Sequence, residues 1–244
     1  MSRAPALLAA LADLFWPPLC AVCPRALPLA PAGWQARFCP ACLDTVELLP
    51  SSLCPVCGRP FYNAAGHLCG DCLADPPPFR TTRTAAVYRG AVARSIGRLK
   101  YDGDLTQTRV LAELAATLPA LPAWEVVVPL PLSPRRLAAR GFNQALALAR
   151  AAFPARLLEP RLLSRPVEAD LPQAVLGRRQ RQRAIRGSFR VPAPGLVRGA
   201  KILLFDDVVT TGATAAEAAR TLLAAGAREV HLAAVARTVL DSWR

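Results

Sequence analysis

The segment Lys201-Ile-Leu-Leu-Phe-Asp-Asp-Val-Val-Thr-Thr-Gly-Ala-Thr214 decides the fold of this chain. Residues 201–206 form a largely apolar run that ends in an acid, which predicts a strand buried on both faces. An Ala-rich stretch at residues 214–225 predicts a helix that covers the sheet, and Gly226 supplies its left-handed C-terminal stop. A second buried strand is expected at residues 229–236. The segment therefore predicts a strand, a crossover helix and a parallel strand.

The residues before this segment alternate in the same manner. Strands are expected at residues 84–88 and 125–130, and helices at residues 92–100, 105–118 and 142–152. Short apolar runs follow near Leu162 and at residues 188–191. Alternation of this kind predicts an α/β fold in which a mostly parallel sheet carries helices on both faces. Because 53% of the chain is apolar, it has enough material for a sizeable core.

The loop after the strand at residues 201–206 is a candidate ligand site, because ligands bind parallel sheets at the carboxyl ends of their strands. Adjacent carboxylates accept sugar hydroxyls or hold a hydrated magnesium ion. Hydroxyl groups and a glycine that lead into a helix N-terminus favour a phosphate. The residues expected to bind a phosphoribosyl group are Asp206, Asp207, Thr210, Thr211, Gly212, Ala213 and Thr214. The alternative is a loop that only caps a helix, with acids that face water.

All eight cysteines fall into Cys-x-x-Cys pairs, which are Cys20/Cys23, Cys39/Cys42, Cys54/Cys57 and Cys69/Cys72. A two-residue gap lets both sulfurs reach one ion at about 2.3 Å, so two pairs complete a tetrahedral zinc site. Two structural zinc ions are therefore expected. Sequential grouping of the pairs is the simplest arrangement, and an interleaved grouping, first with third and second with fourth, stays open. His67 is expected to be solvated, because each site already has four sulfurs.

Two other chemistries of paired cysteines fit less well. A disulfide framework is disfavoured because the chain shows no export signal, and a redox dithiol is disfavoured because such proteins need one pair rather than four. The same reasoning predicts a cytoplasmic protein with reduced thiols. The apolar run behind Arg3 is too short to span a bilayer.

The chain divides at a proline-rich spacer, Asp75-Pro-Pro-Pro78. A zinc module is expected over residues 19–78 and the α/β domain over residues 79–244. The N-terminal residues 1–18 have apolar side chains at helical spacing and end in two prolines, so they predict a short amphipathic helix.

The charge of the chain is strongly positive and mostly carried by arginine. The formal net charge is +13, and Lys100 and Lys201 are the only lysines. Arginine binds phosphate in two-point fashion, so this surface suits phosphate ligands or nucleic acid. Coding from GC-rich DNA would also raise the Ala, Arg and Pro content, and it is the alternative explanation for the overall excess.

Several motifs together resemble one known family. They are the cysteine pairs, Arg98-Leu-Lys-Tyr-Asp-Gly103, Val128-Pro-Leu-Pro-Leu-Ser133, Arg140-Gly-Phe-Asn-Gln144 and the acidic loop. In combination they are similar to the ComF family of competence-associated proteins, and the acidic loop resembles the signature of type I phosphoribosyltransferases. The resemblance covers roughly residues 20–237. It implies a type I phosphoribosyltransferase-like domain behind a double zinc ribbon, with phosphoribosyl pyrophosphate (PRPP) and magnesium as ligands.

The resemblance also implies roles for two basic segments. The expected pyrophosphate loop consists of Ser133, Arg135, Arg136 and Arg140. The expected flexible basic loop contains Arg178, Arg179, Arg181 and Arg183. The alternative for the first segment is a proline-rich turn with solvated arginines. The second segment would equally suit the backbone of a single-stranded nucleic acid.

Three readings of the function follow as expectations. The family resemblance implies a role in natural competence and DNA uptake, with single-stranded DNA and a helicase-type protein as partners. The alternative is an active phosphoribosyltransferase that moves ribose 5-phosphate from PRPP to an unidentified acceptor, for which no general base is evident in the sequence. A third reading is that the pocket binds a nucleic-acid 5-phosphate or a regulatory nucleotide without turnover.

Overall fold

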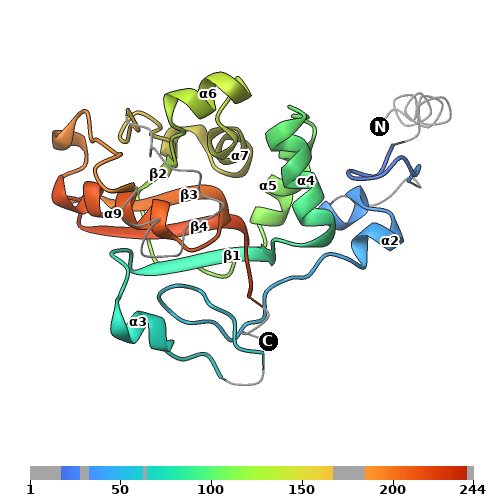
Figure 1. Cartoon of the computed structure of the whole chain (residues 1–244), viewed down its shortest axis with the longest axis horizontal. Coiled ribbons are helices and arrows are strands. Elements are labelled where there is room, and N and C mark those ends of the chain that lie inside the picture. Colours follow the sequence, from blue (N-terminus) through green and yellow to red (C-terminus); the bar gives the residue numbers. More distant parts are fainter. Residues whose placement is uncertain (1–17, 28–32, 63–64, 167–184, 241–244) are drawn as a thin grey trace, which may run out of the picture.

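The computed structural model describes residues 18–27, 33–62, 65–166 and 185–240. Its centre is a four-stranded sheet whose neighbouring strands are all parallel, in the order β1-β4-β3-β2 (Figure 1). The strands are β1 (Thr81–Val87), β2 (Val126–Pro129), β3 (Lys201–Val209) and β4 (Glu229–Arg237). All but one residue of the predicted N-terminal helix at 1–18 lie outside the described residues.

The two longest strands lie side by side in the middle of the sheet. β3 and β4 pair in register from Lys201 opposite Glu229 to Val209 opposite Arg237. The helix that joins them is α9 (Ala213–Ala224), and Gly226 follows it with a φ of 100°. The predicted strand, helix and strand are therefore present, and they form the core of the sheet.

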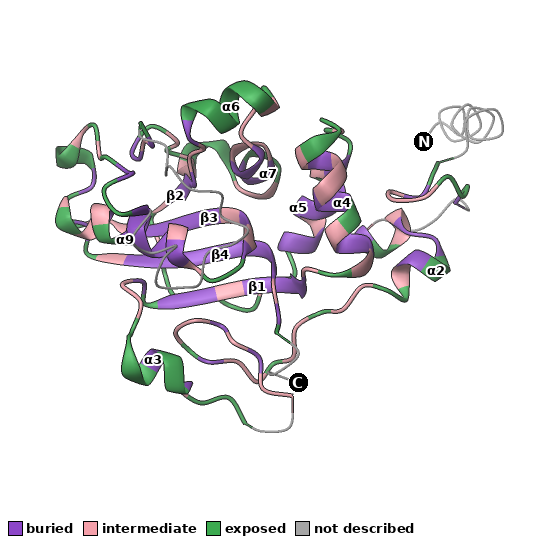
Figure 2. Cartoon of the chain, in the orientation of Figure 1, coloured by how far each residue is buried: buried purple, intermediate pink, exposed green. Residues whose placement is uncertain are grey.

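Helices cover both faces of this sheet. Alternate residues of each strand point to opposite faces, and both faces carry apolar side chains that pack against helices. On one face, Leu203 and Phe205 of β3 pack in a core shared with α4 (Gly90–Tyr101), α5 (Gln107–Ala115) and α7 (Gln144–Ala152). On the other face, Ile202 and Leu204 pack in a core shared with α9. Burial is concentrated in the strands and in the helix faces that contact them (Figure 2). The predicted fold class is confirmed.

Smaller elements complete the described chain. They are the short helices α2 (Pro40–Leu43), α3 (Gly70–Ala74) and α6 (Pro134–Arg140) and the 3-10 turns η1 (Trp34–Arg37), η2 (Ala155–Leu157) and η3 (Pro194–Leu196). Within these described ranges, no helix combines the length and the apolar character needed to cross a bilayer.

The structure differs from the sequence-based expectations in two places. Residues 134–140 form helix α6 rather than an irregular loop, because Pro134 occupies its first turn and Gly141, with a φ of 79°, ends it. Residues 188–191 do not join the sheet. Arg190 makes a single antiparallel bridge with Ser164, and Pro192, which has no N–H to donate, follows at once.

The two cysteine-rich ribbons pack on different parts of the α/β domain. The first contacts the helices, since Arg98 of α4 and Gln107 of α5 both donate to the Ala21 carbonyl, at 2.8 and 2.9 Å. The second contacts the sheet, since Arg237 at the end of β4 donates to the Cys57 carbonyl at 2.7 Å. Figure 1 shows the separation, with α2 of the first ribbon and α3 of the second far apart.

Both outer strands of the sheet carry short additional backbone contacts. The segment between the ribbons runs beside β1, where the Val87 N–H donates to the Glu47 carbonyl at 2.8 Å and the Leu49 N–H donates to the Ala85 carbonyl at 3.2 Å. Beside β2, the Glu159 N–H donates to the carbonyl of Val127 at 2.9 Å. These contacts lie on the sides of β1 and β2 that face away from the sheet centre.

Candidate functional site

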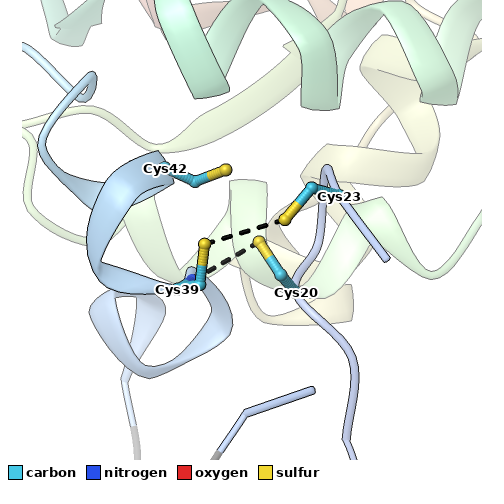
Figure 3. Close-up of side chains that lie close together, drawn as sticks. All are labelled: Cys20, Cys23, Cys39 and Cys42. Atoms are coloured by element: carbon cyan, nitrogen blue, oxygen red, sulfur yellow. Dashed lines mark hydrogen bonds between the residues drawn. The ribbon is translucent and has the colours of Figure 1, made fainter. Parts of the chain in front are cut away.

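The cysteines gather into two clusters that follow the order of the chain. The first tetracysteine cluster is Cys20, Cys23, Cys39 and Cys42, and the second is Cys54, Cys57, Cys69 and Cys72. Within each cluster the four sulfurs lie within 4.8 Å of one another. Figure 3 shows the sulfurs of the first cluster directed toward a common centre. The sequential grouping is the one observed, and the interleaved alternative is wrong.

The spacing of the sulfurs fits a tetrahedral zinc ion. Zinc–sulfur bonds of about 2.3 Å place two thiolates of a tetrahedron about 3.8 Å apart. The sulfurs of Cys23 and Cys39 are 3.7 Å apart, and those of Cys57 and Cys69 are 3.6 Å apart. The Cys39 N–H also points at the sulfur of Cys20, 3.4 Å away, as suits a thiolate. Both clusters can therefore hold zinc, which would tie each ribbon together.

The protein environment prepares one thiolate in each cluster. Burial raises the pKa of the Cys20 and Cys54 thiols, but backbone N–H groups directed at these sulfurs outweigh it and lower each pKa to about 7. Burial, together with neighbouring cysteines, raises the pKa of Cys42 to about 12. A divalent cation relieves this crowding because it stabilises the thiolate form. His67 lies outside both clusters, exposed and stacked on Phe61.

A cleft of about 650 Å³ lies at the carboxyl edge of the sheet. From β3 and the loop that follows it, Asp206, Asp207, Thr210 and Thr214 line the cleft; from α6, Arg136 and Arg140 line it. The parallel order of β2 and β3 explains this meeting, since the segments that leave both strands emerge at the same edge. Two sets of predicted residues, from the acidic loop and from the expected pyrophosphate loop, thus share one cleft.

The two acids of the cleft have different surroundings. Asp207 is 3% exposed, forms an ion pair with the Lys100 ammonium and accepts a hydrogen bond from the Gln144 amide at 3.3 Å. Asp206 is partly exposed, and its Oδ1 accepts the Asp207 N–H at 2.8 Å. Gln144 is oriented in turn by Arg140, which donates to its Oε1. Asp206 is consequently the acid with more surface available to a ligand.

These surroundings separate the acidities of the two acids. Burial raises the pKa of Asp206 well above its usual value, and the neighbouring Asp207 carboxylate raises it further. Burial also raises the pKa of Asp207, but Lys100 and the hydrogen bonds outweigh this effect and the net pKa is lowered. Burial lowers the pKa of Lys100, but the two carboxylates outweigh this effect and the net pKa is raised. Asp207 and Lys100 are therefore both charged at neutral pH.

Not every predicted residue lines this cleft. Thr211, Gly212 and Ala213 line a second cavity of about 460 Å³, together with Cys57 and Cys72 of the second cluster. Thr210 lines both cavities, so the loop separates them.

The remaining residues of the basic segments are placed differently. Ser133 is buried at the start of α6, and Arg135 is exposed on α6. The predicted flexible loop residues Arg178, Arg179, Arg181 and Arg183 lie outside the described part of the chain.

Sequence reasoning missed several residues that line the cleft, namely Tyr88, Lys100, Tyr101, Gln144 and Arg165. Some of these residues do stand in sequence motifs named above. Lys100 and Gln144 belong to two of the motifs that carried the family resemblance, but nothing in the sequence alone gave either a role. Arg165, 6% exposed, stands in no such motif, and its guanidinium lies 5.2 Å from the centre of the Phe189 ring.

Two domain families match the chain. Residues 11–73 match the double zinc ribbon domain, and residues 150–239 match the phosphoribosyl transferase domain. The first match spans all eight cysteines, and the second spans β3, the acidic loop and β4.

Relatives match along nearly the whole chain. The DNA utilization protein YhgH of Salmonella typhi is 34% identical over 235 residues, which cover 91% of this chain and 98% of the relative. The competence protein ComFC of Bacillus subtilis is 28% identical over 214 residues, which cover 79% and 84%. Among solved structures, the glutamine PRPP amidotransferase from B. subtilis matches 51% of this chain and 25% of its own, with 20% identity and a TM-score of 0.33. A likeness of that size carries no argument about activity.

Proposed function

This chain belongs to the ComFC/YhgH family, with a double zinc ribbon before a phosphoribosyltransferase domain, and on that premise we propose a role in DNA utilization or competence. In this role the α/β domain binds a phosphoribosyl ligand, PRPP above all, and the basic surface binds single-stranded DNA. A helicase-type partner belongs to the same proposal. The reduced cysteines suit a cytoplasmic setting.

One observation carries the ligand part of this proposal. Acids, hydroxyls and guanidinium groups from separate parts of the chain converge on one cleft, with Asp206 and Thr214 on one wall and Arg136 and Arg140 on another. A carboxylate accepts ribose hydroxyls, and arginines bind a pyrophosphate. Magnesium would enter with the ligand, because it binds phosphate oxygens readily.

Calorimetry tests PRPP binding to the zinc-loaded protein in the presence of magnesium. Asp206→Asn should weaken binding about tenfold or more, because it removes a charge-assisted hydrogen bond of about 1.5–3 kcal/mol to a sugar hydroxyl. Glu159→Gln is the matched control, since it neutralises an exposed acid that is not among the residues lining the cleft. Equal affinity of all three proteins would refute the proposed site.

Single-stranded DNA binding is tested through its dependence on salt. Each phosphate neutralised contributes about −0.7 to the slope of log affinity against log salt for a single strand. A combined Arg178→Ala, Arg179→Ala and Arg181→Ala variant should flatten that slope, because it removes three cations from the basic segment. A wild-type protein with a flat slope would contradict the DNA-binding part of the proposal while leaving the PRPP part intact.

The placement of Arg136 and Arg140 favours a second function, the active phosphoribosyltransferase. In that reaction the bond between ribose C1 and pyrophosphate breaks, and the pyrophosphate leaves with the electron pair. An acceptor oxygen or nitrogen forms the new bond to C1 and releases its proton to the solvent. Water serves as a test acceptor. Pyrophosphate release above the buffer rate that disappears in Asp206→Asn supports turnover, whereas tight binding with no release supports a binding role.

A further inference from the structure

The acidic pair of the cleft already has a cation beside it. Lys100 extends from the last turn of α4, and its ammonium forms an ion pair with Oδ2 of Asp207. The two side chains are only 16% and 4% exposed, so water screens this pair weakly. Lys100 also lines the cleft itself, together with Asp206. The ammonium therefore occupies the place beside Oδ2 of Asp207 where a metal ion bound to this oxygen would have to lie.

The carboxylate oxygens around this ammonium are mostly engaged. Oδ1 of Asp207 accepts the Gln144 amide, and Oδ2 of Asp207 faces Lys100. Oδ1 of Asp206 accepts the Asp207 N–H at 2.8 Å. Arg140 fixes the orientation of the Gln144 amide by donating to its other end. A divalent ion that used Oδ2 of Asp207 would have to displace the ammonium or sit against it, with strong charge repulsion.

The helix that carries Lys100 is held from its other side by the first ribbon. A guanidinium nitrogen of Arg94 lies 3.7 Å from the sulfur of Cys42, and Arg98 donates to the Ala21 carbonyl at 2.8 Å. Arg98 also pairs with Asp104 just beyond the helix, at 2.9 Å. These contacts hold α4 near its middle and in its last turns, so the helix that carries Lys100 is fixed where the lysine contacts Asp207.

We propose that Lys100 is the resident cation of the acidic pair, so that the pair binds ribose hydroxyls through Asp206 without a directly bound divalent ion. Magnesium then follows the pyrophosphate of the ligand and not the acids. The ligand part of this inference rests on the proposed phosphoribosyl site, but the metal part does not. Lys100 is accordingly a positioning residue: it fixes Asp207 and replaces a metal ion.

The metal part is tested on zinc-loaded protein without ligand, by manganese titration read with electron paramagnetic resonance. Wild type should show only weak, surface-type manganese binding. Lys100→Met should gain a site at least about tenfold tighter, because a like charge at contact distance is removed. Lys100→Arg is the matched control, since it keeps the cation and should stay like wild type. A tight manganese site in wild type that Asp206→Asn abolishes would overturn the inference, and this arm needs no Lys100 variant to fold.

The ligand part is tested with ribose 5-phosphate, which has no pyrophosphate to carry a metal. Wild type should bind it with the same affinity, within about twofold, in metal-free and magnesium-containing buffer, as expected where a protein ammonium supplies the charge. Lys100→Met should bind more weakly without magnesium and recover when magnesium is added. A merely structural role of Lys100 would not produce that rescue.

The outcomes separate the two proposals. If wild type requires magnesium for ribose 5-phosphate, the resident-cation inference is wrong and the phosphoribosyl site stands. If wild type binds ribose 5-phosphate under neither condition, the phosphoribosyl proposal fails, and the manganese titration still decides the role of Lys100. A double Lys100→Met/Asp207→Asn variant should lose the gained manganese site, which assigns that site to the acidic pair.

Discussion

The two tetracysteine clusters have the same ligands and the same spacing within each pair, yet they serve different parts of the molecule. The first cluster packs beneath α4 and α5 and shares a core with them. The second forms a small core of its own and lines a cavity with the loop after β3. The same set of four cysteines thus packs against a helix pair in one case and lines a cavity in the other.

The contacts of each ribbon explain the difference. The first contacts α4, the helix that carries Lys100, and Lys100 in turn contacts the acidic pair of the cleft. The second reaches the sheet directly, and Gly58, with a φ of 69°, lets it approach closely. A β-carbon at Gly58 would lie 2.8 Å from the Thr82 carbonyl of β1. The comparison therefore predicts that loss of the first cluster disturbs the acidic cleft, while loss of the second disturbs residues 210–213.

Removal of both metal ions should have the largest effect. Each structural site contributes on the order of 10 kcal/mol to the folding of its ribbon, so a strong chelator should abolish the cooperative thermal transition of the whole chain. Circular dichroism measures the transition, and a colorimetric zinc assay should count two ions released per chain. An unchanged transition after complete release would show that the α/β domain is stable without either metal site, and the proposed stabilising roles of both clusters would be wrong.

Variants that lose one cluster at a time should show which part of the molecule each cluster supports. Cys42→Ser should speed amide hydrogen exchange in α4 and weaken ribose 5-phosphate binding, because it loosens the contacts that hold α4, the helix that carries Lys100. Cys57→Ser should speed exchange in β1 and at residues 210–213, with a smaller effect on α4. Hydrogen exchange read by mass spectrometry resolves these segments. The same exchange pattern in both variants would mean that the two ribbons act as a single unit.

Loss of the lysine from the buried ion pair should cost less than loss of a metal. Lys100→Met leaves Asp207 charged and unpaired, which destabilises the fold by about 3–5 kcal/mol at neutral pH. The double variant with Asp207→Asn should recover most of that loss, because neither partner of the former ion pair then carries a charge. Urea unfolding at pH 7 measures both. A double variant as unstable as the single one would show that Lys100 acts through packing and not through charge.

The two acids should respond oppositely to pH and to neutralisation. Because the folded pKa of Asp207 is lowered, its contribution to stability is present above its unfolded pKa and is lost as pH falls through the folded value. The folded pKa of Asp206 is raised, so this acid costs stability as pH rises above its unfolded value. Asp206→Asn should therefore stabilise the fold at pH 7 while weakening ligand binding, and Asp207→Asn should destabilise it. Opposite signs would contradict the assigned asymmetry.

The smallest effect is expected at the link between the second ribbon and the sheet. Arg237→Met removes the hydrogen bond to the Cys57 carbonyl, and such a bond contributes about 1–3 kcal/mol when one partner is charged. Thermal unfolding measures the loss. The acidic cleft should keep its affinity for ribose 5-phosphate, because Arg237 is not among the residues that line it.

The sequence was sufficient for the parts of this molecule that local patterns determine. The apolar run of β3, the Ala-rich α9 and its glycine stop have signals within one stretch, and the cysteine spacing determines the metal ligands. Helix α6 was missed although Ser133, Pro134 and Gly141 are typical of a short helix with both ends marked. Its seven residues hold too few apolar positions for a visible helical period.

The residues that meet only in three dimensions were beyond local patterns. Lys100 and Asp207 are more than a hundred positions apart in the chain, and their pairing depends on how α4 packs on the sheet. The same holds for the division of the acidic loop, whose Thr214 faces one cavity and whose Gly212 faces the other. The loop is a single motif in the sequence, but its residues line two different cavities.

The backbone contacts along β1 and β2 have a consequence for association between molecules. An outer strand with unpaired N–H and carbonyl groups invites a strand from another chain. Here the segment at Glu47 and Leu49 occupies part of the outer side of β1, and Glu159 occupies part of β2. The connection between the two ribbons thereby also hinders edge-to-edge aggregation, which an outer strand with open backbone groups would otherwise risk.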